Sequence, residues 1–227
     1  ALKMGTTIIT VTTVDNNRTA SCIVDVVDAT GAIDLGLSVR WAAFNVGATT
    51  PEEYGDYFAW GETEPYYQPG YAQSDVPVWK SGKEAGYYNS SYIWSNGSSS
   101  YTRYSSSDGK TDFSDYDFVD DAARANWDGS WRTPTQEEWR QLQSQCDWIW
   151  TTQDGKNGYL VTSKKNGNSI FLPAAGHRSL TKMQDLNSSG TYMQSTSNYV
   201  TSLNTNRINI YGIFNRTYGS SVRPVTE

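Results

Sequence analysis

The sequence predicts an α+β domain that is preceded by a β-hairpin from a different module. Two short segments near the middle of the chain have helical periodicity, and the last third consists of alternating, strand-like segments separated by turn residues. The beginning of the chain also alternates, and a short junction separates it from the remainder of the sequence. We therefore expect a partial module over 1–28 and a main domain over 29–227, with mixed and antiparallel sheets around two helices.

The first segment, 1–27, alternates between two faces on either side of a polar turn at 15–17. An isolated hairpin is only marginally stable in water, so this one is expected to complete a sandwich or to lean on the main domain. The string GTTIITVTTVDNNRTASCIVDV resembles the last two strands of a bacterial Ig-like domain of the second type. Because the chain starts inside this pattern, we expect a fragment whose export signal lies upstream.

The main domain is expected to open with a strand and a short helix. Alternating apolar residues over 33–39 predict a strand that ends at Trp41. Thr50, Pro51 and Glu53 have the spacing of a helix start, with a capping hydroxyl, a proline in the first turn and an acid three residues after the cap.

Residues 66–114 form a long aromatic stretch that is rich in serine and glycine. The segment SNGSSSYTRYSSSDG has no periodicity, which predicts an irregular insert. Inserts of this length in a compact domain are usually functional or flexible. We expect tyrosine and tryptophan side chains between Tyr66 and Tyr104 to be exposed as platforms for a ligand.

Two helices and a series of strands are expected after the insert. The helices cover 117–126 and 135–146, and Thr135 with Glu138 forms the capping box of the second. In the first helix, Val119 is expected on the side that faces the core. Strands come next at 159–163 and 169–172 around an Asn-Gly turn, and then at 192–195, 207–211 and 221–225.

Composition excludes several classes of partner. The formal net charge is -6, and no run of basic residues is longer than the pair Lys164–Lys165. A protein that binds the phosphate backbone of a nucleic acid needs a concentrated basic face, so no nucleic-acid partner is expected. The same absence argues against an anionic membrane surface, and no apolar run is long enough for direct membrane insertion.

Few residues are suited to catalysis, and we expect no catalytic residue, no metal and no cofactor. His177 is the single histidine, and no nucleophile motif accompanies it. Cys22 and Cys146 fall in different modules, so both are expected to be buried free thiols. Acidic residues gather at 115–121, where the charge of a helix N-terminus explains them better than a calcium ion does.

Several segments together are similar to the Fibrobacter succinogenes major paralogous domain family of Bacteroidota. They are DLGLSVRWAAFNVGA, YGDYFAWGE, DDAARANWDGSWRTPTQEEWRQL, GYLVTSKKNGNSIFLPAAGHR and YGSSVRPV. The resemblance implies a secreted, cell-surface protein with a C-type-lectin-like fold, related to that of formylglycine-generating enzymes. The copper enzymes of that fold need two neighbouring cysteines, and the iron enzymes need several histidines; this chain has no such cysteine pair and one histidine. The calcium-dependent lectins of that fold need a Glu-Pro-Asn or Gln-Pro-Asp tripeptide, and neither tripeptide occurs in this chain.

The resemblance also implies that the strand around 35–41 pairs with the one around 221–225, because such folds close their two ends into one sheet. It further implies that four tryptophans in the best-matching segments are buried beneath the helices. These are Trp127, Trp131, Trp139 and Trp148.

The ligand site is expected on the face formed by the late segment, 192–218, with part of the aromatic insert. The family usually has a Tyr-Trp-Ser-Ser-Thr-like segment where this chain has Tyr192-Met193-Gln194-Ser195-Thr196, and the residues after it are rich in Asn, Thr, Tyr and Arg. The candidate ligand-binding residues are Tyr192, Met193, Gln194, Tyr199, Asn206, Arg207, Asn209, Tyr211, Asn215 and Arg216. Strand alternation favours Arg207, Asn209 and Tyr211 on one face.

Three functions stay open at this point. The chain is expected to be an adhesin-like domain that binds a glycan or a protein. It could instead be a hypervariable display domain diversified by a retroelement, because the late segment has a compatible composition. The third alternative is a structural end domain of a pilus or stalk, which the Ig-like hairpin favours.

Overall fold

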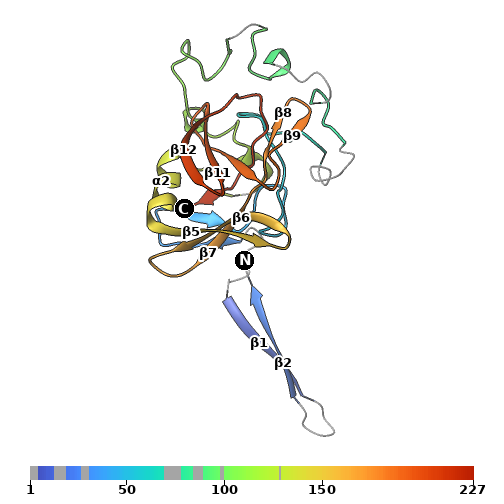
Figure 1. Cartoon of the computed structure of the whole chain (residues 1–227), viewed down its shortest axis with the longest axis vertical. Coiled ribbons are helices and arrows are strands. Elements are labelled where there is room, and N and C mark those ends of the chain that lie inside the picture. The colour runs from blue at the N-terminus through green and yellow to red at the C-terminus, as the bar shows by residue number, and fades with distance from the viewer. Residues whose placement is uncertain are drawn as a thin grey trace.

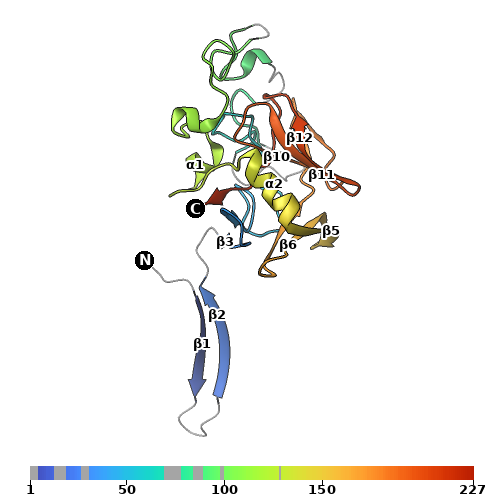
Figure 2. The same ribbon diagram turned by 90° about the vertical axis from the view of Figure 1, so that its left-hand side faces the viewer.

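The structure is a computed structural model that describes residues 5–12, 19–26, 31–68, 78–83, 89–97, 100–127 and 129–227. It has the mixed α+β composition that the sequence predicts, with few helices and several small antiparallel sheets. Figures 1 and 2 show a body of short strands and loops, from which the N-terminal hairpin projects.

The N-terminal hairpin is confirmed. Strand β1 (Gly5–Thr12) pairs antiparallel with β2 (Thr19–Val26), and Ile9 lies opposite Cys22 in the register. Neither strand pairs with any other described strand. The predicted turn at 15–17 and the side chain of Cys22 lie outside what the structure describes.

The two ends of the main domain meet in one sheet, as predicted, although of the strand expected over 221–225 only Val225 belongs to it. Strands β3 (Ala32–Ile33), β4 (Arg40–Ala42) and β13 (Val225–Thr226) form it, with Val225 opposite Trp41. Both views place the C-terminus beside the first strands of this domain. Arg132 adds a bridge to Val225 on the other side, so the last strand is held between two neighbours.

The continuous strand expected over 33–41 is wrong, because long-range hydrogen bonds bend the chain between β3 and β4. Gly36 takes a left-handed φ of 68°, and its amide donates to the carboxylate of Asp34. The side-chain amides of Asn166 and Asn168 both donate to the carbonyl of Asp34. The carbonyl of Asp34 therefore accepts hydrogen bonds from side chains of the 163–168 turn and not from the backbone of a neighbouring strand.

The short helix expected at 50–53 is also wrong; the segment is a turn. The Glu53 carboxylate accepts from the amides of Thr49 and Thr50, as it would at a helix start. The chain then enters the core at Tyr54, and Gly55 with φ 72° cannot continue a helix.

The second predicted helix is confirmed, and the first is shorter than predicted. Helix α2 (Gln136–Gln145) begins at the Thr135 capping box. Helix α1 covers only Ala122–Asn126, after the 3-10 turn η2 (Phe113–Tyr116) and a left-handed bend at 117–118. Val119 lies next to that bend and is exposed, so the expectation that it faces the core is wrong.

Three further groups of strands complete the body. Strands β5 (Cys146–Gln153), β6 (Lys156–Ser163) and β7 (Ser169–Pro173) form the sheet predicted around the Asn-Gly turn, and β8 (His177–Ser179) pairs with β9 (Lys182–Gln184). Strands β10 (Ser189–Met193), β11 (Tyr199–Asn204) and β12 (Arg207–Ile213) form another antiparallel sheet. No specific strand was predicted over β11.

Helix α2 packs along β12 and covers its free edge. The side-chain amides of Gln136 and Gln143, two turns apart, donate to the carbonyls of Ile210 and Ile208. The other side of α2 buries Trp139 completely, with its ring 4.8 Å from that of Trp41. An unpaired strand edge can pair with another chain, and the two glutamines satisfy two of the backbone carbonyls that this edge would otherwise expose.

The prediction of buried tryptophans is confirmed in part. Trp139 and Trp131 are buried, whereas Trp127 and Trp148 are half-buried at the margins of the core. Cys146 is a buried free thiol, as predicted.

Candidate functional site

The insert is irregular in its described parts, as predicted, but several of its described aromatic rings face inward. Tyr71, Tyr87 and Tyr88 lie outside the described residues. Tyr66, Tyr67, Tyr92 and Tyr104 are all buried, so the expectation that they form exposed platforms is wrong. Figure 1 shows the insert at the end of the body away from the N-terminal hairpin, where it includes the 3-10 turn η1 (Asn89–Ser91). Two depressions lie against it.

The larger depression, the insert groove, lies between the insert and the start of β11 and has a volume of about 670 Å³. One wall is the 100–111 part of the insert, and the other is 196–199 with Arg216. Its lining consists of Ser100, Tyr101, Tyr104, Ser105, Ser106, Gly109, Thr111, Thr196, Ser197, Asn198, Tyr199 and Arg216.

Asp112 joins the two walls at one end of the insert groove. Its carboxylate accepts from the hydroxyls of Ser195 at 2.6 Å and Thr196 at 3.1 Å. Next to it, the amide of Ser197 donates to the carbonyl of Thr111 at 2.8 Å. The walls are therefore fixed by the fold and do not need a ligand to bring them together.

Asp108 fixes the conformation of the loop 104–110, which is part of the 100–111 wall of the insert groove. Its carboxylate accepts from the amides of Tyr104, Ser105 and Lys110 and from the hydroxyl of Tyr116. These hydrogen bonds, that of Lys110 first, lower the pKa of Asp108 to about 2. The loop 104–110 is thus a closed turn around an ionised carboxylate, with Ser106 exposed at its tip.

Arg216 crosses from the late segment to the insert at the base of the groove. Its Nη2 donates to the carbonyl of Tyr104 at 2.5 Å and its Nε donates to Asn198 Oδ1 at 3.0 Å. The guanidinium lies over the Tyr101 ring, 4.4 Å from its centroid. Burial lowers the pKa of Arg216, but an arginine with this shift remains charged at neutral pH.

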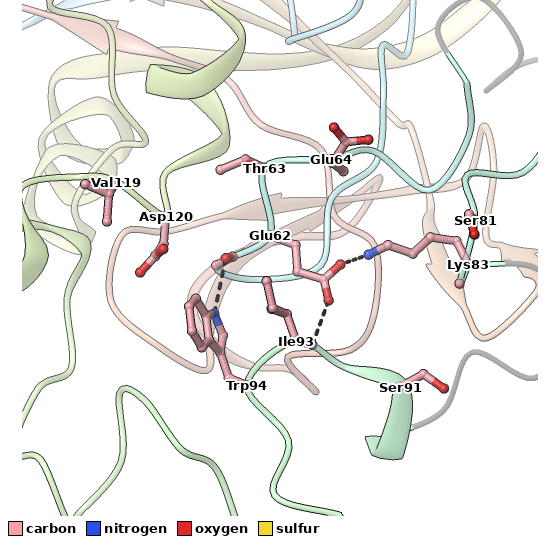
Figure 3. A pocket seen from close by; sticks show the side chains of 12 residues that line it. Glu62, Thr63, Glu64, Ser81, Lys83, Ser91, Ile93, Trp94, Val119 and Asp120 are labelled. Carbon is pink, nitrogen blue, oxygen red and sulfur yellow. Dashed lines mark hydrogen bonds and ion pairs between the residues drawn. The ribbon is translucent and has the colours of Figure 1, made fainter.

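The smaller depression, the Glu62 pocket, has a volume of about 270 Å³ and is drawn in Figure 3. Glu62 lies at its centre, where it pairs with Lys83 and accepts from the amide of Ile93. The indole of Trp94 donates to the carbonyl of Gly61 at 3.2 Å. Burial lowers the pKa of Lys83 to about 7.

The charges of the Glu62 pocket are satisfied within the protein. Glu64 pairs with Lys80 at 2.8 Å, and Asp120 pairs with Arg103 at 3.1 Å and accepts from the hydroxyl of Tyr104 at 2.6 Å. Such internal pairing is what a structural support for the insert requires. We therefore take the insert groove as the candidate site.

The predicted site residues fall into three places. Tyr192, Met193 and Gln194 are wholly or almost wholly buried, so their expected position on a ligand-facing surface is wrong. The reason is that β10 lies between β11 and the 220–222 segment, with Tyr192 bridged to Ser221. The amide of Gln194 donates to the carbonyl of Ile210 and to the hydroxyl of Thr201.

The second place is the outer face of β12. Arg207, Asn209 and Tyr211 alternate with the inward Ile208 and Ile210, and the pairing of β11 with β12 is irregular between Asn209 and Gly212. Arg207 is exposed and Asn209 is half-buried. Tyr211 is 60% exposed. Asn206 and Asn215 lie in exposed turns at the two ends of β12.

The third place is the insert groove, which Tyr199 and Arg216 line. Arg216 is buried at its base, not displayed on a surface as predicted, because its side chain ties the two walls together. The sequence reasoning placed part of the insert at the site but did not single out the 100–111 wall. The signal available was the Tyr-Ser run that ends at Asp108, whose spacing is that of a side-chain-capped turn.

The acidic residues at 115–121 have separate structural roles. Asp115 belongs to the capping box of η2, and the buried Asp121 accepts from the amide and hydroxyl of Thr133. The described residues contain no group of three or more His, Cys, Asp or Glu that could hold a metal ion.

Comparison with models of protein families, with curated proteins and with solved structures found no match to this chain. Among the residues that the structure describes, no helix combines the length and the hydrophobicity that a membrane crossing requires.

Proposed function

We propose that the chain is a non-catalytic, saccharide-binding domain of a secreted cell-surface protein, with a C-type-lectin-like fold, and that the insert groove is its binding site. The observation that carries this proposal is the groove's lining. Tyrosine rings lie there among hydroxyl and amide groups, on walls that internal hydrogen bonds hold in place.

This lining suits the two kinds of surface that a sugar presents. The C–H faces of a sugar ring pack on aromatic side chains, and its hydroxyls exchange hydrogen bonds with hydroxyl and amide groups. Tyr101 and Tyr199 are half-buried in the lining, and Ser100 and Ser106 are exposed. A groove of about 670 Å³ is within the range that small-ligand sites occupy.

Binding in this groove would not depend on calcium. No carboxylate is among the described residues that line it, so it lacks the oxygen ligands that a calcium ion needs. We expect saccharide binding to be the same in calcium and in a chelator.

The non-catalytic part of the proposal is supported by the surroundings of the reactive side chains. The His177 ring lies 4.8 Å from that of Phe214 and stacks at 5.9 Å on Tyr218. Burial raises the pKa of the Cys146 thiol to about 11, which keeps it protonated and a poor nucleophile.

The fold and the cell-surface location rest on the sequence resemblance. Two features of the structure support the proposed fold: the first and last strands of the domain pair, and the two helices precede strands β5 to β12.

A glycan array with the full chain, with and without calcium, tests the function, and a pair of tyrosine variants tests the site. Tyr101→Ala removes a ring of the groove and should weaken binding of any glycan found by about tenfold or more. Tyr211→Ala removes an exposed ring on β12 and should leave binding unchanged.

If Tyr211→Ala weakened binding and Tyr101→Ala did not, the binding site would lie on the outer face of β12 and not in the insert groove. An array without binding would contradict the saccharide proposal, and a protein ligand or a structural end domain would then be the better account.

A further inference from the structure

We infer that the insert groove selects saccharides that carry a carboxylate, and that Arg216 supplies the positive charge that selects them. The inference rests on the proposed function, because it names the class of sugar that this groove would bind.

Arg216 is a cation whose hydrogen-bond acceptors are all neutral. It donates to the carbonyl oxygens of Arg103 and Tyr104 and to the side-chain oxygens of Ser197 and Asn198. Among the residues that the structure describes, Arg216 forms no ion pair. Its charge is therefore buried at the base of the groove without a partner of opposite sign.

The lining of the groove offers hydrogen-bond donors and contains no carboxylate among the described residues. Arg216 is the charged residue of the described lining, and most of the remainder are serine, threonine and asparagine. Two carboxylates lie just outside the lining, and both accept hydrogen bonds within the protein. Asp108, which acts on Arg216 electrostatically, accepts three hydrogen bonds from its own loop and one from the hydroxyl of Tyr116. Asp112 accepts from the hydroxyls of Ser195 and Thr196. A carboxylate entering the groove would meet one cation and several hydroxyl donors.

Other arginines in the molecule show what a purely structural arginine looks like here. Arg103 has its counter-ion in Asp120, at 3.1 Å. Arg223 is 0% exposed and is enclosed by backbone carbonyls and Asn45. Arg216 lacks the counter-ion that Arg103 has and, unlike the fully enclosed Arg223, it lines a groove that is open to solvent.

Physical chemistry favours an anion at such a place. A buried charge without a partner loses hydration that neutral acceptors replace only in part. A ligand carboxylate would restore the missing counter-charge where low dielectric strengthens the attraction. A neutral sugar of the same shape would gain the ring and hydroxyl contacts but not this attraction.

The test compares matched sugars on the full chain by calorimetry. Tri-galacturonic acid is paired with its methyl ester, and sialyllactose with the methyl ester of its sialic acid, so that each pair differs only in the charge of the carboxyl group. We expect at least one acid to bind about tenfold or more tightly than its neutral partner. The two pairs distinguish a uronic from a sialic acid.

A substitution at the rim tests the groove without touching the hydrogen bonds of Arg216. Ser106→Asp places a carboxylate at an exposed lining position and should weaken binding of the acid about tenfold or more, whereas the matched Ser106→Asn should not. Arg207→Gln removes an exposed cation from β12, outside the groove, and should have no effect.

Equal binding of acid and neutral partner would overturn this inference and leave the proposed function standing. Acid binding that Ser106→Asp does not weaken would also overturn it. The absence of binding to every sugar tested would overturn both.

Discussion

Arg223 shows how a single side chain can hold together a domain in which loops are long and sheets are small. Its guanidinium donates to the carbonyls of Ala42, Ala43 and Phe171 and to Asn45 Oδ1, at distances between 2.6 and 3.0 Å. These bonds join the C-terminal segment to β4 and β7. Irregular backbone inside a core must find partners for its carbonyls, and a planar cation with five donors meets several at once.

Asp56 contrasts with Arg223, because burial destabilises the ionised form of its carboxylate. It is 8% exposed, and desolvation raises its pKa from 3.8 to about 6. The folded protein therefore holds this proton more tightly than the unfolded chain does. The contribution of Asp56 to the free energy of unfolding is largest below about pH 4 and falls as pH rises to about 6.

We predict that Asp56→Asn stabilises the protein at pH 7.5 relative to the native chain and removes this pH dependence. At about 1.4 kcal/mol per pKa unit, the gain is on the order of 1–3 kcal/mol. Urea unfolding at pH 4 and pH 7.5 measures it, with Asp147→Asn as an exposed control. A native chain whose stability relative to Asp56→Asn is the same at both pH values would contradict the prediction.

At the scale of the element, the sequence predicted those structures whose determinants are local. The Thr135 capping box starts α2 at the expected residue, and the Asn166-Gly167 turn joins β6 to β7. In both cases the signal and the structure that it fixes lie within a few residues of each other.

The elements that the sequence did not predict depend on distant partners. The strand expected at 33–41 is interrupted because the side-chain amides of Asn166 and Asn168 donate hydrogen bonds to the carbonyl of Asp34. The outward position expected for Tyr192 is wrong because its ring packs against Trp139 and its hydroxyl donates to the carbonyl of Pro173. A periodic pattern indicates that a strand has two faces, but not how many neighbours it will have.

Helix α2 provides a test of core packing at this scale. Trp139 is 0% exposed, and its ring lies 4.8 Å from Trp41 and 5.6 Å from Tyr192. We predict that Trp139→Ala lowers the free energy of unfolding by about 3–5 kcal/mol, because the cavity would lie between the helix and the two sheets that contain Trp41 and Tyr192. Arg140→Ala, on the exposed side of the same helix, should leave stability unchanged. A loss below about 1 kcal/mol at Trp139 would mean that the site collapses or is not core.

At the scale of the whole molecule, the candidate site is a product of long-range assembly. The insert groove brings 100–111 next to 196–199, and Arg216 reaches both. Composition was enough to direct attention to the late segment and to the insert, because polar and aromatic residues gather in both. It could not indicate which of their faces meet, since Tyr104 and Tyr101 differ in exposure although they lie three residues apart.

The two ends of the chain have opposite importance for the fold, and this leads to the last prediction. Strands β1 and β2 pair with each other and with no other described strand. Val225, in contrast, is 0% exposed and pairs with both Trp41 and Arg132. We predict that a chain of residues 31–227 keeps the melting temperature and the ligand binding of the full chain.

A chain that ends at Pro224 loses far fewer residues but should fail to fold cooperatively. It would leave the inner strand β4 with an open edge and uncover Trp41 at the centre of the core. Thermal unfolding monitored by near-UV circular dichroism measures both chains, because the signal reports tryptophan packing. If the shortened N-terminus lowered the melting temperature by more than a few degrees, the hairpin would have to be packed on the domain. If the chain ending at Pro224 melted as the full chain does, closure by β13 would not be what completes the fold.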